Sequence, residues 1–176
     1  MRKLGSLRCA AALSMLLLAA CATTPPPQAP AEPAVDTAAL VAAVRAAAGP
    51  ADVKDELAIQ PLRDPMVEGL RQQATQLENQ RKYVEAAAAL DQALAIVDDD
   101  PAILQERAEA ALFAADFDGA ERFARQAHAV GAQVGPLCRR HWATIRTVRD
   151  HAHDVAGTAE AQRQFDACRV AAPPRY

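Results

Sequence analysis

The sequence predicts an all-α protein built from antiparallel helical hairpins, and three observations point to this fold class. Alanine makes up much of the 51% hydrophobic share while aromatic residues make up 4%, and alanine favours helices that pack closely. Asp64-Pro65 and Asp100-Pro101 each place a side-chain acceptor before a proline, which is typical of a helix start. The segment beginning at Tyr83 matches the one beginning at Phe117, an offset of 34 residues.

The first twenty residues have the features of a removable signal sequence. Residues 1–8 are positively charged, and residues 10–20 form an apolar stretch that is too short to span a bilayer, which needs about 20 residues. The stretch ends in Leu18-Ala19-Ala20-Cys21, which resembles the lipobox of bacterial lipoproteins. The resemblance implies cleavage after Ala20, a diacylglycerol group on the Cys21 thiol and an acylated amino terminus. An ordinary secretory signal with a chance cysteine is the alternative.

A tether is expected to follow the lipid anchor. Ala22 stands where enteric bacteria place the aspartate that retains lipoproteins in the inner membrane, so the resemblance implies an outer-membrane anchor facing the periplasm. Proline occupies five of the fifteen positions in 22–36, which favours a semi-extended chain. Four segments result: a signal peptide (1–20), the lipidated cysteine and linker (21–36), a short helix closed by Gly49-Pro50 with an irregular stretch (37–63), and a helical repeat domain (64–173).

The 34-residue period resembles the tetratricopeptide repeat, a helix–turn–helix unit with small residues at fixed positions. Counted from Val67, the first unit has its characteristic residues at Leu70, Ala74, Tyr83, Ala86 and Ala93. Counted from Pro101, the second has them at Leu104, Ala108, Phe117, Ala120 and Ala127. A divergent third unit fits 135–173 with Cys138, Trp142, Ile145, Ala161, Phe165, Cys168 and Pro173. It has a tryptophan where a small residue belongs, and about seven residues are expected as an insertion between its helices. The resemblance implies a short right-handed solenoid; a generic alanine-rich bundle is the alternative.

Two of the four cysteines are predicted to form a disulfide. Cys9 would be lost with the leader and Cys21 acylated, which leaves Cys138 and Cys168 as an even pair in an oxidising compartment. If the turn of the third hairpin spans about 149–157, the two cysteines lie level with each other, about ten residues from the turn. The bridge therefore requires a helix break within 149–157. Two buried free thiols are the alternative.

Charge and motifs argue against several classes of function. The formal net charge is −3, and removal of three basic leader residues gives 16 − 22 = −6, without the basic patch of a nucleic-acid-binding protein. The two serines lie in the leader, and no P-loop or dinucleotide-binding turn appears. Residues 150–154 and 98–100 lack a complete set of metal ligands. We expect no catalytic site, no cofactor, no metal and no nucleic-acid ligand.

The repeat resemblance implies that a protein ligand binds along the concave face made by the first helix of each unit. The residues assigned to that face are Arg71, Thr75, Glu78, Asn79, Gln105, Glu109, Leu112, Phe113, Arg139 and Arg146. They could equally be solvated helix faces, but two of them are apolar residues opposite the expected core. We expect a lipid-anchored, periplasm-facing adaptor with an unidentified protein partner. The alternative is a structural lipoprotein that tethers the membrane to the cell wall.

Overall fold

The computed structural model describes residues 35–49 and 64–169. The helices in these ranges are α1 (Thr37–Ala47), α2 (Pro65–Asn79), α3 (Tyr83–Ile96), α4 (Pro101–Phe113), α5 (Phe117–Val130), α6 (Gly135–His151) and α7 (Val155–Ala167). The described residues contain no β-strand, and none of their helices is both long and apolar enough to cross a membrane. The predicted signal peptide, Cys21, most of the tether, the irregular stretch before residue 64 and Pro173 lie outside the described residues.

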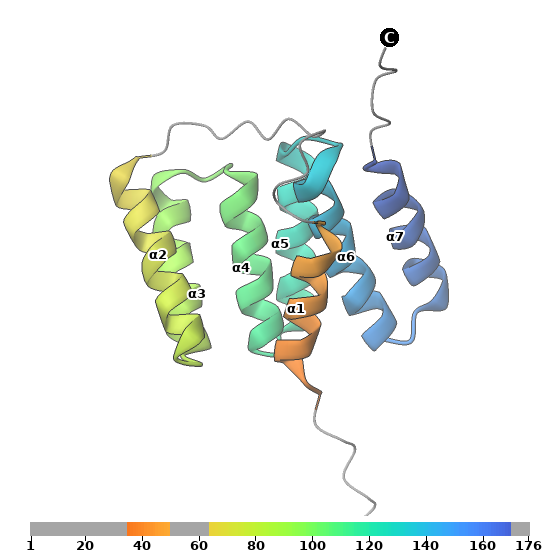
Figure 1. Cartoon of the computed structure of the whole chain (residues 1–176), viewed down its shortest axis with the longest axis horizontal. Helices are drawn as coiled ribbons and strands as arrows, with labels where there is room; N and C mark the ends of the chain where they lie inside the picture. Colours follow the sequence, from red (N-terminus) through yellow and green to blue (C-terminus); the bar gives the residue numbers. More distant parts are fainter. Residues whose placement is uncertain (1–34, 50–63, 170–176) are drawn as a thin grey trace, which may run out of the picture. The chain divides into compact units, whose positions relative to one another are not determined.

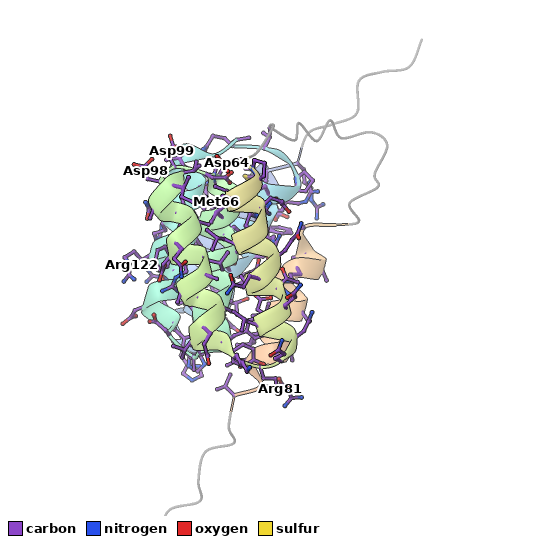
Figure 2. All side chains as sticks on the ribbon, turned by 90° about the vertical axis from the view of Figure 1, so that its left-hand side faces the viewer. Asp64, Met66, Arg81, Asp98, Asp99 and Arg122 are labelled. Atoms are coloured by element: carbon purple, nitrogen blue, oxygen red, sulfur yellow. A yellow bond between two sulfur atoms is a disulfide. The ribbon has the colours of Figure 1, made fainter. Side chains whose placement is uncertain are left out.

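Both predicted Asp-Pro helix starts are confirmed. The Asp64 carboxylate accepts a hydrogen bond from the Met66 amide at 2.7 Å, at the beginning of α2 (Figure 2). The Asp100 carboxylate accepts from the next two free amides of α4, at 2.8 and 3.1 Å. In each helix the proline occupies the first turn, where its missing amide hydrogen costs nothing. Local sequence signals therefore set where the first helix of these two hairpins begins.

The helices α2–α3, α4–α5 and α6–α7 form three antiparallel hairpins in succession (Figure 1). All three close with a three-residue turn whose central residue has a left-handed backbone, with φ of +60° at Arg81, +58° at Ala115 and +56° at His153. In each turn the next amide donates to the carbonyl five residues back at 2.9 Å, a helix closure of the Schellman type. The predicted succession of antiparallel helical hairpins is thus confirmed, including the divergent third hairpin.

The expected insertion in the third hairpin is wrong, because the extra residues lie within its helices, on either side of a short turn. Leu104 lies twelve residues before the residue that caps α5, whereas the equivalent Cys138 lies sixteen before the residue that caps α7. Ala120 lies four residues after its cap and Ala161 lies seven after its own. About one helical turn is thus added between each of these positions and the connecting turn, which occupies only 152–154.

The buried apolar side chains of the hairpins form two clusters. One lies between α2, α3 and α4 and consists of Val67, Ala74, Ala86, Ala89, Leu90, Ala93, Ile103 and Ala110. The other extends from α4 to α7 and contains the large side chains Leu112, Trp142, Ile145 and Phe165. Trp142 fits where a small residue was expected because its ring packs edge-on against His128 of α5, with centroids 4.9 Å apart.

The short helix α1 packs against α4 and α6, a question the sequence left open. Its Val41 and Val44 are each 1% exposed and belong to the larger cluster. Figure 1 shows α1 in orange beside the succession of hairpins, and Figure 2 shows that it lies on the α2 side of the first hairpin, away from α3. The side formed by the first helices of the hairpins is therefore covered by α1 over part of its length.

Candidate protein-binding site

The ten residues assigned to a binding groove all belong to α2, α4 and α6, whose common side is here called the first-helix face. Helix α1 contacts this face at both ends. The Thr37 hydroxyl donates to the Phe113 carbonyl at 3.1 Å, where α4 ends. At the other end, the Arg139 guanidinium donates to the Ala48 carbonyl at 2.7 and 3.1 Å, where α1 ends. Two of the predicted groove residues are therefore engaged by a helix of the same chain.

Between these two contacts, Arg45 of α1 reaches two carboxylates of the first-helix face. Its Nε donates to Glu109 at 2.7 Å and its Nη2 to Glu78 at 2.8 Å. The Arg45 guanidinium also lies 5.5 Å from the centre of the Phe113 ring, which stacks on Tyr83 at 4.6 Å. The nearby carboxylates raise the pKa of Arg45 although its burial acts in the opposite direction. A single arginine thus connects α1 to α2 and α4.

The Glu109 carboxylate lies fully buried at the centre of this face. Besides Arg45, it accepts hydrogen bonds from Arg140 of α6, one of them at 2.5 Å, and from the Gln105 amide at 2.8 Å. Burial of a carboxylate is strongly unfavourable unless it is paired and hydrogen-bonded, and here three donors satisfy it. The arrangement joins α1, α4 and α6 through one negative charge.

A polar chain continues from Glu109 between α4 and α6. The Gln105 amide also donates to the Thr144 hydroxyl at 2.9 Å, and its carbonyl oxygen lies 2.7 Å from His141 Nδ1. Because that oxygen can only accept, His141 carries a proton on Nδ1. Burial, followed by the positive charges of His128 and Arg140, lowers the pKa of His141 to about 3. His141 is therefore a fully buried residue that connects α6 to α4.

Three of the predicted groove residues cannot contact a partner in this structure. Gln105, Glu109 and Leu112 are 0% exposed, so their assignment to an open groove is wrong. The physical reason is that α6 and α1 pack directly on this part of α4. Phe113 is half-buried in the Tyr83 stack, and Arg146 lies over the Phe165 ring at 5.3 Å while donating to Gln162.

The first-helix face remains open beside α2. Thr75 and Asn79 are exposed there, and Arg71 and Glu78 are half-buried. A cavity of about 150 Å³ lies between α1 and α2, lined by Arg45, Arg71, Ala74, Thr75, Glu78, Leu90, Glu106 and Arg140. Arg71 donates to Glu106 at 2.9 Å and to Glu68 at 2.8 Å. Burial raises the pKa of Glu78 while Arg45 lowers it. Three of the ten predicted residues, Arg71, Thr75 and Glu78, therefore line an open, charged recess.

Sequence reasoning missed three residues that shape this region: Arg45, Glu106 and Arg140. Arg45 could have been noticed, because it is the one charged side chain in an otherwise alanine- and valine-rich helix. Glu106 and Arg140 carry no comparable signal, since exposed arginines and glutamates are common on helices. Their pairing depends on how the helices pack.

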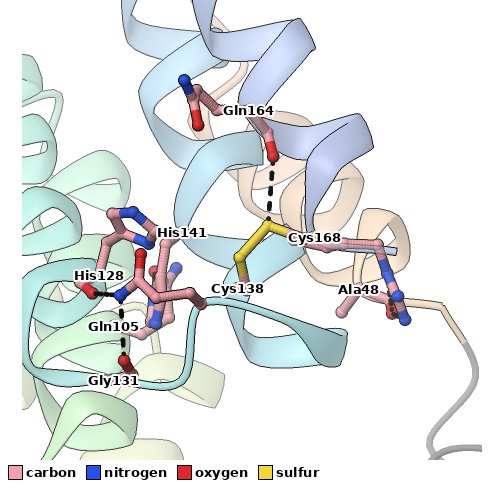
Figure 3. The surroundings of a disulfide bond; sticks show 10 residues. Ala48, Gln105, His128, Gly131, Cys138, His141, Gln164 and Cys168 are labelled. Carbon is pink, nitrogen blue, oxygen red and sulfur yellow. Dashed lines mark hydrogen bonds between the residues drawn. A yellow bond between two sulfur atoms is a disulfide. The ribbon is translucent and has the colours of Figure 1, made fainter. Parts of the chain in front are cut away.

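The predicted disulfide between Cys138 and Cys168 is present, with a Cα–Cα distance of 5.7 Å (Figure 3). Its geometry follows from the turn. Cys138 lies thirteen residues before the end of α6 at His151, and Cys168 lies thirteen after the start of α7 at Val155. The predicted helix break within 149–157 is confirmed as well. The bridge joins the far ends of the last hairpin.

The two acidic stretches take structural roles in the helices. The Asp154 carboxylate accepts from the Gly157 amide at 2.8 Å and pairs with Arg149 at 3.1 Å. The His151 ring stacks on Phe117, with centroids 3.8 Å apart. In the other stretch, Asp100 caps α4 while Asp98 and Asp99 point into solvent (Figure 2). Within the described residues, no group of three or more histidine, cysteine, aspartate or glutamate side chains is placed to hold a metal ion.

Comparison with known proteins found a similarity to one solved structure. No protein-family model matches the sequence, and no curated protein matches it. Among solved structures, the chain is similar to the globular C-terminal domain of LpoP from P. aeruginosa. The sequence identity is 27% and the TM-score is 0.55, over 60% of this chain and 99% of the LpoP domain. This helical chain therefore resembles a whole globular domain of a bacterial protein.

Proposed function

We propose that this chain is a lipid-anchored adaptor of the bacterial cell envelope that faces the periplasm and binds another protein. The observation that supports it most is the open, charged recess beside α2, on the face where tetratricopeptide-like hairpins receive protein ligands. The similarity to the LpoP domain supports a bacterial helical module of this kind. The proposal includes no catalytic activity, no cofactor and no nucleic-acid ligand.

The proposed anchor is Cys21, which follows the lipobox-like residues 18–20. With Ala22 behind it, we place the lipid in the outer membrane. Cys21→Ser should abolish cleavage by the lipoprotein signal peptidase and incorporation of radiolabelled palmitate. Cys138→Ser, which leaves the lipobox intact, is the control and should be labelled normally. Continued palmitate labelling of the Cys21→Ser variant would contradict the anchor.

The proposed partner surface is the open part of the first-helix face. A photo-crosslinking amino acid at Thr75 or Asn79, both exposed, should capture a defined envelope protein in intact cells, identified by mass spectrometry. The matched control position is Arg122 of α5, which is exposed and lies on the side of the first hairpin opposite α1 (Figure 2). Equal capture of the same protein from Arg122 would argue against a specific surface beside α2.

A structural tether between membrane and cell wall is a second candidate, and the proline-rich stretch 22–36 favours it. In that case the anchor and spacer matter more than the recess. The same crosslinking experiment separates the two candidates, because a tether would recover murein fragments where an adaptor recovers a protein.

A further inference from the structure

Helix α1 occupies the first-helix face as a peptide ligand would. Its hydrogen bonds there involve a short set of groups, here called the α1 seat: Glu78 of α2, Glu109 and Phe113 of α4, and Arg139 of α6. At the two ends of α1, the Arg139 guanidinium and the Phe113 carbonyl recognise a helix terminus and a hydroxyl. The seat therefore binds a helix by features that another chain could also present.

The side chains that α1 contributes form a compact pattern. Val41 and Val44 are each 1% exposed, and Arg45 follows directly with its two carboxylate partners. The opposite side of the helix consists of exposed alanines: Ala38, Ala39, Ala42, Ala43 and Ala46. Recognition of α1 thus depends on two aliphatic residues three positions apart, with an arginine immediately after the second.

The α1 seat also remains electrostatically satisfied without α1. The buried Glu109 carboxylate keeps its hydrogen bonds from Arg140 and Gln105, which both belong to the hairpins. Glu78 would lose Arg45 but lies next to the open recess, where water can reach it. Departure of α1 therefore leaves no buried charge unpaired, which would otherwise oppose its release strongly.

We infer that the α1 seat is a helix-binding site, and that a partner helix with the pattern aliphatic-x-x-aliphatic-arginine takes the place of α1 there. This inference rests on the proposed adaptor function and names the kind of partner segment involved. Helix-in-groove recognition uses anchors spaced three and four residues apart, the spacing of Val41, Val44 and Arg45. In the unbound chain α1 fills the site and keeps its apolar surface from water.

The test uses the purified full-length chain and a synthetic peptide of residues 35–49. In the receptor, Val41→Asp with Val44→Asp expels the chain's own α1, and circular dichroism and an intact Cys138–Cys168 bridge confirm that it is folded. The fluorescent wild-type peptide should bind this receptor more than about tenfold tighter than a peptide carrying the same two aspartates. A peptide with Ala42→Asp and Ala43→Asp, on the exposed side of α1, is the matched control and should bind like the wild type.

A second receptor covers the case in which the aspartates unfold the first. A protease site inserted within 50–63 allows α1 to be cut from its own chain, after which the labelled wild-type peptide should exchange with the bound α1. No binding to either folded receptor, or equal binding of the Val→Asp peptide, overturns the inference. A wild-type dimer in sedimentation that Val44→Asp converts to a monomer would also overturn it, because the occupant would then be a second copy of α1. The adaptor proposal would survive either result if crosslinking at Thr75 still captured its partner.

Discussion

The hairpin α2–α3 and the hairpins α4–α7 are built on the same repeat but differ in what covers their first helices. In the open hairpin, α2–α3, Thr75 and Asn79 face solvent. In the covered hairpins, α4–α7, Gln105 and Glu109 are 0% exposed beneath α1 and α6. Residues at the groove positions of the repeat are thus exposed in one unit and buried in the next. Repeat position alone does not determine whether a side chain can meet a partner.

The two regions also differ in how they are stabilised. The open hairpin relies on a cluster of mainly alanines with Leu90 and Ile103, and alanine contributes little apolar area per residue. The covered hairpins add Trp142, Phe165, α1 and a disulfide. Among the described residues, no further hairpin packs on α7. The extra side chains and the disulfide therefore stabilise a terminal repeat that lacks an outer neighbour.

Among single changes to the two regions, loss of the disulfide should lower the free energy of unfolding most. Cys138→Ala with Cys168→Ala opens a loop with a sequence separation of 30, and we expect a loss of about 3–4 kcal/mol in the free energy of unfolding. Chemical denaturation of the variant and the wild type measures it. Thiol titration of the denatured, unreduced mature wild type should find no free cysteine. Two reactive thiols in protein purified from the periplasm would contradict the bridge.

Truncation of a leucine to alanine should cost more stability in the covered hairpins than in the open hairpin. Leu112 is fully buried in the covered hairpins, so Leu112→Ala should cost about 3 kcal/mol. Leu77→Ala is the matched change in the open hairpin, where the leucine is only partly buried, and it should cost about 1 kcal/mol. Urea unfolding followed by circular dichroism measures both. Equal losses would mean that α1 and α6 add little to the packing around Leu112.

A third comparison concerns two glutamates of α4. Glu109→Gln removes a buried charge shared by Arg45 and Arg140, and we expect a loss of about 2 kcal/mol in unfolding free energy. Glu106→Gln removes the partner of Arg71 in the open recess, where water screens the pair, and should cost less than about 1 kcal/mol. Thermal unfolding at low and high salt measures both, and only the Glu106 pair should respond strongly to salt.

A dependence of stability on pH should also reside in the covered hairpins, and over the first pH unit below 6.5 it should amount to about 1 kcal/mol. Burial lowers the pKa of His141 from 6.5 to about 3. Between these pH values His141 is therefore protonated in the unfolded chain and neutral in the folded chain. This contribution to stability is complete above pH 6.5 and is lost as the pH falls towards 3, by about 1.4 kcal/mol per pH unit.

Unfolding free energies at pH 6.5 and about one unit lower measure this slope. His141→Gln should reduce it, whereas His153→Asn in the exposed α6–α7 turn should leave it unchanged. An unchanged slope in the His141 variant would mean that other groups cause the acid sensitivity.

Local sequence signals were sufficient for the helices and for the bridge. Asp64 and Asp100 set helix starts because a cap acts within one turn of its own chain. Cys138 and Cys168 could be paired because both lie the same number of residues from one turn, whether that turn is short or long. The seven extra residues of the third unit were counted correctly but misplaced, since a count does not say whether residues join a loop or a helix.

Which side chains of the first-helix face are buried was decided only by tertiary structure. The sequence by itself determined the repeat, its small residues and the candidate face, because periodicity and turn chemistry are local. It could not show that α1 folds back onto α4 and α6, since that depends on Val41, Val44 and Arg45 meeting groups more than sixty residues away. The same contact buries Glu109 and Leu112 and leaves Thr75 and Asn79 exposed, so the location of the open recess follows from packing between distant segments.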